Sequence, residues 1–367
     1  MRPAFSSIRQ AGAFALLLLC LLLGPAFAGK KILPSREAIY SSIWWENGDF
    51  PYMEEQVFRE GGDMDIVFMG SSHIWAAFDT PYVQARLSKE LGHAAVARTF
   101  GWGGAGYDET YFVAQDLLGH HRVRMLVIDD DGGDSDQPHL LASRMFRFGD
   151  NEADLDGLPA STKANYYFAS IAGLPRNLLS LARVDLPADM TATNYWQTRS
   201  LAENFAQQFG AFTARIGFRD NPAAEPEPFV KYVPQTDVQP SVVCVYSSGS
   251  KTNFAFSSEP LPTTQWYFAR KLAALAQEHG CKLVVLHVPT WDERHANVVS
   301  LRTFWPDVAH AAVTMIGVQP AKLFAGLTDD QMRKLYSDSV HFNENGQNYF
   351  TALMTPTLLK LYESQNH

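Results

Sequence analysis

The feature that most constrains the fold is a series of short apolar runs that alternate with helical stretches. The runs cover residues 65–69, 94–100, 124–128 and 281–288. Each is apolar on both faces and ends near glycine, proline or acidic residues, which is typical of strands buried in a parallel sheet. Helical patterns follow at residues 80–92, 108–118, 263–279 and 343–362. This alternation predicts an α/β fold, a three-layer sandwich with a mainly parallel sheet.

The pattern weakens between residues 135 and 261, where aromatic residues, proline and asparagine are common and no period holds. We interpret 135–261 as a central insertion, or cap, within a single catalytic domain that spans residues 29–367. The α/β pattern resumes after it, so the insertion interrupts one domain and does not separate two.

The first 28 residues have the order of a secretory signal peptide. Arg2 and Arg9 give a positive start, residues 11–23 are apolar, and Ala26 and Ala28 supply small residues at the spacing of a cleavage site. We therefore predict cleavage after Ala28 and a periplasmic or extracellular protein. The alternative is an uncleaved anchor helix, for which the apolar run is short.

Charge and cysteine content narrow the range of partners. The formal net charge is −9, from 39 acidic and 30 basic side chains, so nothing in the composition favours nucleic acid. Beyond the leader only Cys244 and Cys281 remain. Export permits a disulfide between them, whereas their apolar surroundings favour buried free thiols, and the sequence leaves both open.

Two motifs carry chemistry. The first, Met69-Gly70-Ser71-Ser72-His73, directly follows the first apolar run. Glycine permits a tight turn there, and a serine would then stand at the carboxyl end of the sheet, where open α/β folds bind ligands. Backbone amides at the following helix start can stabilise an oxyanion. The alternative is that the two serines only cap the helix that follows. His73, next to Ser72, is a candidate neighbour of the site.

The second motif is Asp338-Ser-Val-His341, just before the last helical stretch. An Asp three residues before a His can place its carboxylate on one imidazole nitrogen and leave the other to take a proton from serine. Asn343 or Asn345 can cap the helix that follows.

Together the two motifs resemble the SGNH, or GDSL-like, hydrolase family. That family has a serine block, a glycine block and an asparagine block after its first three strands, and an Asp-x-x-His block near the C-terminus. The resemblance implies Ser72 as nucleophile, Asp338 and His341 as its partners, and the Gly101 amide in the oxyanion hole. It covers the strands before residue 135 and the C-terminal third.

Two departures from the family pattern matter. Ser71 stands where many members have Asp, a form similar to members that act on cell-envelope polymers, such as the teichoic-acid D-alanylation protein. The third block has Gly132-Gly133-Asp134 and no clear Asn. Asp134 is the candidate third donor, but an ionised carboxylate repels an oxyanion. The hole would then rest on the backbone amides of Ser72 and Gly101.

Two competing patterns are weaker. Gly101, Gly103 and Gly106 fit the dinucleotide fingerprint, with acids at residues 129–131, but bulky Trp102 and export argue against a nicotinamide cofactor. The acidic run 129–136 lacks the alternating oxygens of a calcium loop, so we interpret it as strand-end carboxylates in solvent. The sequence thus predicts no cofactor and no metal.

The resemblance and the leader together imply an exported esterase or O-acetyltransferase of the cell envelope. Its substrate would be an acylated glycan or an exopolysaccharide, and a transferase would need a membrane protein to deliver acyl groups. Trp75, Trp102 and Trp291 could stack on sugar rings or pack in the core. The alternative is a catalytically silent carbohydrate-binding module with the same fold.

Overall fold

The computed structural model describes residues 7–28, 35–41, 43, 50–146, 151–180, 196–199, 212–215, 243–246, 253–302, 305 and 313–364. Six strands in this part of the chain form the main sheet: β1 (Met64–Gly70), β2 (Ala97–Gly101), β3 (Val123–Asp129), β6 (Val243–Tyr246), β8 (Lys282–Leu286) and β10 (Val313–Val318).

The main sheet is mostly parallel. Its strand order is β2-β1-β3-β8-β10-β6, and β6 pairs with β10 as the antiparallel strand at one edge. In register, Gly70 of β1 lies opposite Gly101 of β2. The carboxyl ends of β1, β2, β3 and β8 therefore meet at one edge, where open α/β sheets bind ligands.

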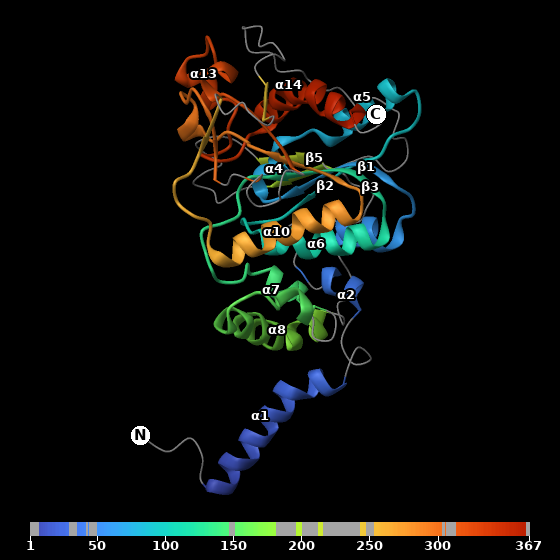
Figure 1. The fold of residues 1–367 in the computed structure, drawn as a ribbon, viewed down its shortest axis with the longest axis vertical. Coiled ribbons are helices and arrows are strands. Elements are labelled where there is room, and N and C mark those ends of the chain that lie inside the picture. The colour runs from blue at the N-terminus through green and yellow to red at the C-terminus, as the bar shows by residue number, and fades with distance from the viewer. Residues whose placement is uncertain are drawn as a thin grey trace.

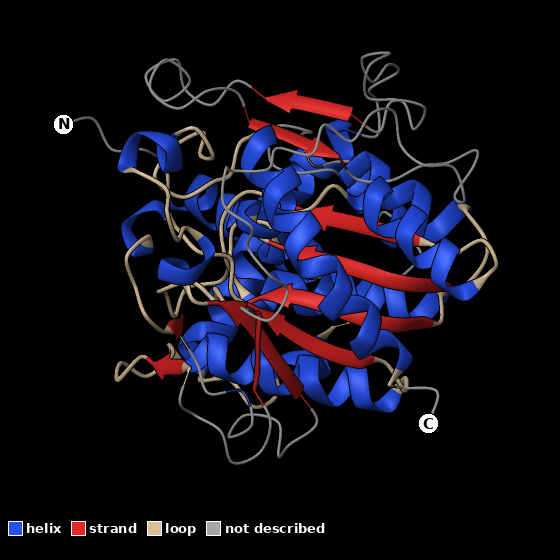
Figure 2. Ribbon diagram, turned by 90° about the horizontal axis from the view of Figure 1, so that it is seen from above, coloured by secondary structure: helices blue, strands red, loops and turns tan. Residues whose placement is uncertain are grey.

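Helices cover both faces of this sheet (Figure 1). Figure 2 looks onto one of these faces and shows the strands side by side beneath the helices. One layer contains α6 (Tyr107–His120) and α10 (Thr263–Glu278), and the other contains α4 (Ser72–Ala77), α5 (Thr80–Leu91) and α14 (Glu344–Glu363). The predicted α/β class with a mainly parallel sheet is confirmed, and the layers are compatible with a three-layer sandwich.

Alternation along β1 explains why helices are needed on both faces. Val67 and Met69 belong to the core under α6 and α10, whereas Ile66 and Phe68 belong to the core under α5 and α14. All four side chains are fully buried. A strand that is apolar on both faces is stable only when both are covered, which is why the first apolar run has no period of two.

The described residues contain further helical elements outside these layers. They are α1 (Ile8–Ala28), α2 (Arg36–Ser41), α3 (Phe50–Glu54), the π-helical turn η3 (Glu55–Arg59), α7 (Ala142–Met145), η4 (Glu152–Leu155), α8 (Ala160–Ser180), η7 (Trp291–Glu293), α12 (Pro320–Leu323) and α13 (Asp329–Arg333). Two small sheets pair β4 (Trp196–Arg199) with β5 (Phe212–Arg215), and β7 (Phe254–Phe256) with β9 (Val299–Leu301).

The described part of segment 135–261, which the sequence predicts as an insertion or cap, contributes a strand to the main sheet. Its strand β6 extends the main sheet beside β10, and α7 and α8 lie beneath α6 and α10 in Figure 1. Cys244 on β6 and Cys281 before β8 are both buried and free, so of the two alternatives the structure has separate thiols. Burial raises the pKa of Cys281 to about 12.

The segment predicted as a signal peptide is helical over Ile8–Ala28. Helix α1 ends at Ala28, the predicted cleavage residue, and extends away from the sheet in Figure 1, while Gly29 lies outside the described residues. Within the described ranges, no helix has the length and apolar content needed to cross a membrane.

Candidate active site

The three residues predicted as a catalytic set come from two distant parts of the chain. Ser72 is the first residue of α4, directly after β1. Asp338 and His341 lie in the loop between α13 and α14. The fold brings both segments to the carboxyl edge of the sheet, so residues separated by more than 260 positions come into contact.

Ser72, His341 and Asp338 form a continuous chain of hydrogen bonds. Ser72 Oγ lies 2.7 Å from His341 Nε2, and His341 Nδ1 lies 2.7 Å from Asp338 Oδ2. When Nδ1 carries the ring proton, it donates to Asp338 and leaves Nε2 to accept from the Ser72 hydroxyl. These distances fall within the range for a nucleophile and its base.

Asp338 is held so that its carboxylate stays ionised. Its other oxygen, Oδ1, accepts hydrogen bonds from the backbone amides of Val340 and His341, each 2.7 Å long. Burial alone would raise the pKa of Asp338, but the hydrogen bond and charge of His341 and these two amides outweigh it and lower the pKa below its ordinary value. Asp338 therefore accepts hydrogen bonds at neutral pH.

The loop that carries Asp338 and His341 is fixed from both sides. Tyr336 donates its hydroxyl to the carbonyl of Pro289 at 2.8 Å, and the amide of Trp291 donates to Ser339 O at 2.9 Å. Asn343 caps α14 by accepting from Gly346 N, as one of the two predicted caps. These contacts connect the loop to the turn that follows β8.

The turn before Ser72 rests on a buried carboxylate that sequence interpretation placed in solvent. Asp129, at the end of β3, is only 2% exposed. It accepts hydrogen bonds from the amide of Ser71, 3.0 Å away, and from the Ser71 hydroxyl. Burial raises the pKa of Asp129 to about 8, although the bonds from Ser71 act in the opposite direction.

The same turn requires glycine. A Cβ at Gly70 would lie 2.7 Å from Asp129 Oδ1, closer than real contacts allow. Ser71 is also the N-cap of α4, because its side chain accepts from His73 N. The two serines therefore have different roles. Ser71 holds the turn through its hydrogen bonds to Asp129, and Ser72 is hydrogen-bonded to His341.

The predicted oxyanion donors are placed as follows. Ser72 opens α4, so its amide has no acceptor within the helix and no described residue accepts from it. Gly101 lies against Trp75, and a Cβ there would be 2.4 Å from Trp75 Cβ. Asp134 does not join them: its side chain is 79% exposed and pairs with Arg302. The third-donor prediction is corrected accordingly.

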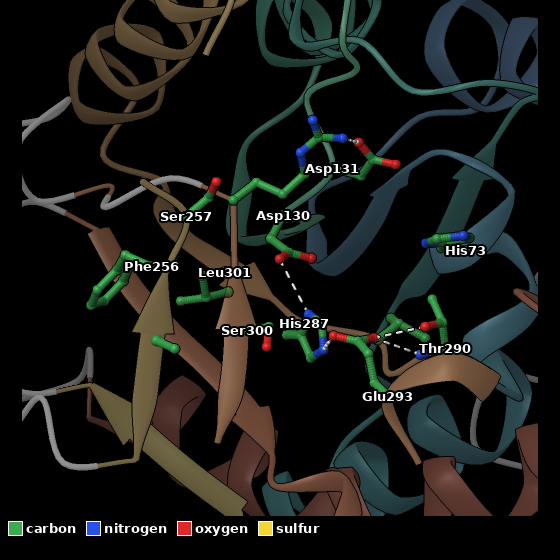
Figure 3. A pocket seen from close by; sticks show the side chains of 13 residues that line it. His73, Asp130, Asp131, Phe256, Ser257, His287, Thr290, Glu293, Ser300 and Leu301 are labelled. Carbon is green, nitrogen blue, oxygen red and sulfur yellow. Dashed lines mark hydrogen bonds and ion pairs between the residues drawn. The ribbon is translucent and has the colours of Figure 1, made fainter. Parts of the chain in front are cut away.

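A cavity of about 400 Å³ lies beside His73, the residue that follows Ser72 in the chain (Figure 3). His73 lines it, and the His73 and His341 rings meet edge to face with centroids 5.5 Å apart. Burial and the charge of His341 lower the pKa of His73, which keeps its ring neutral at neutral pH. The other lining residues are Asp130, Asp131, Ala255, Phe256, Ser257, His287, Val288, Thr290, Glu293, Ser300, Leu301 and Arg302.

His287 lies at the centre of a buried ionic cluster in this cavity. Its Nδ1 is 3.2 Å from Asp130 Oδ2 and its Nε2 is 3.3 Å from Glu293 Oε1. Burial lowers the pKa of His287, but the two carboxylates more than offset this and raise it to about 10. The same pairing lowers the pKa of Glu293 against the effect of burial. Asp130 lies 157 residues from His287 in the chain, so this pairing could not be predicted from the sequence.

Two of the three tryptophans considered for sugar stacking are core residues. Trp75 and Trp102 are at most 2% exposed, whereas Trp291 lies under the guanidinium of Arg294, 4.4 Å from the ring centroid. No group of His, Cys, Asp and Glu side chains in the described ranges is placed to hold a metal ion.

Comparison of the sequence with known proteins does not assign the chain to a family. The chain matches no protein-family model and no curated protein sequence.

Proposed function

We propose that this chain is a serine-dependent O-acyl transferase or esterase that acts through an acyl-Ser72 intermediate. The observation that carries the proposal is the hydrogen-bonded series Ser72–His341–Asp338, with 2.7 Å at both junctions. That geometry is the one that activates a serine hydroxyl for attack on a carbonyl. A neighbouring cavity of about 400 Å³ gives room for a substrate.

The chemistry has two halves. His341 Nε2 takes the Ser72 proton while Oγ attacks the ester carbonyl, and the imidazolium then protonates the departing alcohol. Water or a sugar hydroxyl next gives its proton to His341 and attacks the acyl-serine, which restores Ser72. Asp338 stays ionised throughout and holds the ring through Nδ1, as the lowered pKa of its carboxyl favours.

Charge on the tetrahedral intermediate would be stabilised by backbone amides. The Ser72 amide, at the start of α4, has no acceptor among the described residues, and the Gly101 amide is the second candidate, with Gly101 in register with Gly70. Donors that are already oriented toward a developing oxyanion stabilise it strongly.

The substrate part of the proposal rests on the resemblance to SGNH enzymes and on the leader. We assign the chain an exported, cell-envelope role in which the acyl group, an acetyl group in the simplest case, belongs to an extracytoplasmic polysaccharide. A transferase in that compartment would receive acyl groups from a membrane protein. N-terminal sequencing of the exported protein should begin at Gly29, and an intact Met1 in a cytoplasmic protein would remove this assignment.

The catalytic assignment is tested with single and double variants. Ser72→Ala and His341→Ala should each lower turnover of a small acetyl ester by roughly 10³-fold or more, and the double variant should lose no more than either alone, because the residues act as a unit. Exposed positions supply matched controls, Ser135→Ala and His279→Ala, which should keep full turnover. Folding is checked by circular dichroism.

Transfer and hydrolysis are separated by the products. With an acetyl donor and rising concentrations of an unacetylated oligosaccharide, a transferase should form acetylated sugar while free acetate falls. Acetate as the sole product, together with loss of esters from acetylated glycans, would make the chain an esterase. Normal turnover by a folded Ser72→Ala or His341→Ala protein would remove that residue from the mechanism, whereas no turnover by the folded wild-type protein would leave a silent carbohydrate-binding module as the better description.

A further inference from the structure

We infer that the cavity beside Ser72 binds a neutral or positively charged polyhydroxy group, such as a hexose or amino-sugar unit, and excludes uronate and phosphate groups. The assignment of this unit as the partner in acyl transfer rests on the proposed function. The charge selectivity rests on the cavity itself. The role in acyl transfer and the charge selectivity can therefore fail independently.

The cavity is connected to the proposed catalytic residues through His73. His73 follows Ser72 in the chain and contacts the His341 ring, and Figure 3 shows it on one side of the cavity, facing the ionic cluster of Asp130, His287 and Glu293. A group bound between them would lie close to the catalytic serine. The volume of about 400 Å³ lies in the range of small-molecule sites.

Charge disfavours anions, because the two cations among the described lining residues are already paired with carboxylates. His287 lies between Asp130 and Glu293. Arg302 Nη1 lies 3.2 Å from Asp131 Oδ1, and the same guanidinium pairs with Asp134. Four carboxylates thus surround two cations, which leaves an excess of negative charge for any incoming carboxylate or phosphate to meet.

The cavity has oxygen atoms that can accept hydrogen bonds from the hydroxyl or ammonium groups of a ligand. Asp130 uses Oδ2 for His287, and Asp131 uses Oδ1 for Gly133 N and Arg302. Their other oxygens have no partner among the described residues, nor has either ring nitrogen of His73. Free carboxylate oxygens accept from neighbouring hydroxyls, and a neutral imidazole can both donate and accept.

The wall opposite His73 is partly apolar. Strand β7 contributes Ala255 and Phe256, strand β9 contributes Ser300 and Leu301, and Ser257 follows β7. Figure 3 shows Leu301 and Ser300 beside the cluster. Apolar side chains next to polar ones match a sugar ring, which offers C–H faces and a hydroxyl rim. A long acyl chain would instead leave the carboxylates desolvated without partners.

The experiment measures binding without chemistry. Calorimetric titration of the Ser72→Ala protein at low salt would use oligosaccharides of equal length: neutral ones built on glucose, mannose, galactose or N-acetylglucosamine, a glucosamine oligomer, and uronic acid oligomers. We expect at least one neutral or cationic oligomer to bind about tenfold or more tightly than every uronate.

A charge-removing variant makes the test specific. Asp131→Asn should weaken glucosamine binding and strengthen uronate binding, each by about tenfold, because it removes one negative charge and loosens Arg302. Asp63→Asn, at an exposed position before β1, should keep the wild-type pattern. Equal or tighter uronate binding in the Ser72→Ala protein overturns the inference, as does no binding by any neutral or cationic oligomer. Failure to acylate Ser72 in the wild-type protein would overturn the proposed function alone.

Discussion

Three histidines near Ser72 have different environments and therefore different roles. His341 lies between a serine and a carboxylate. His73 pairs with no carboxylate of the described residues, and burial lowers its pKa. His287 lies between two carboxylates, which raise its pKa to about 10. Of the three, only His341 is hydrogen-bonded to Ser72 and so placed to take its proton.

At the residue scale, the role of Asp338 can be separated from simple structural support. Asp338→Asn keeps the shape of the side chain but presents an amide that can hold His341 in the wrong tautomer. We expect turnover of a small ester to fall by roughly 10⁴-fold with little change in KM. Steady-state kinetics measures both, and an effect confined to KM would place Asp338 in substrate binding instead.

The three catalytic candidates could be predicted from the sequence because each belongs to a short motif of neighbouring residues. Ser72 follows a strand and a glycine, and Asp338 and His341 are three residues apart before a helix. Asp129 could not be assigned in this way. Its burial depends on the register of β1 against β3 and on the Ser71 hydrogen bonds, which an acidic run in a sequence does not reveal.

At the element scale, the turn from β1 into α4 depends on close contact with β2. Gly101→Ala would place a Cβ 2.4 Å from Trp75 Cβ, so α4 must move and Ser72 must move with it. We expect a loss of about 1–3 kcal/mol in the free energy of unfolding and a fall of roughly 100-fold in turnover.

Gly61→Ala is the matched control, since a Cβ at Gly61 meets no atom within 4 Å. Denaturant unfolding and ester turnover are measured on both variants. If Gly101→Ala leaves both quantities unchanged, the contact between Gly101 and α4 does not position Ser72.

Helices and strands were predicted accurately from the sequence where one hydrophobic pattern ran over the whole helix or strand. The helix predicted at residues 343–362 is α14, capped by Asn343, and the run at 281–288 contains β8. The place of β6 in the main sheet was not predicted, because the strand has only four residues and lies at the edge of the sheet. Its pairing with β10, some 70 residues later, is a tertiary property.

At the scale of the whole molecule, the ionic cluster around His287 links stability to pH. The folded-state pKa of His287 is about 10, against an ordinary value of 6.5. A raised pKa means that the stabilisation is fully present below pH 6.5 and is lost as pH rises through about 10. The difference in melting temperature between the wild-type protein and His287→Gln should therefore shrink as pH rises from 6.5 to 10.

Because other groups titrate in this range, the comparison uses the difference between the two proteins, with His279→Gln at an exposed helix end as control. Thermal unfolding followed by circular dichroism gives the melting temperatures. A difference that stays constant, or grows with pH, would contradict a charged His287 between Asp130 and Glu293.

The most direct test of the central claim is mass spectrometry of the wild-type protein after a short incubation with an activated acetyl ester. We predict one added acetyl group, mapped by proteolysis to the peptide that contains Ser72, formed only slowly in the His341→Ala protein and absent in the Ser72→Ala protein. An acetyl group on another residue, or none on Ser72 while the protein is folded and the ester is consumed, would contradict an acyl-Ser72 mechanism.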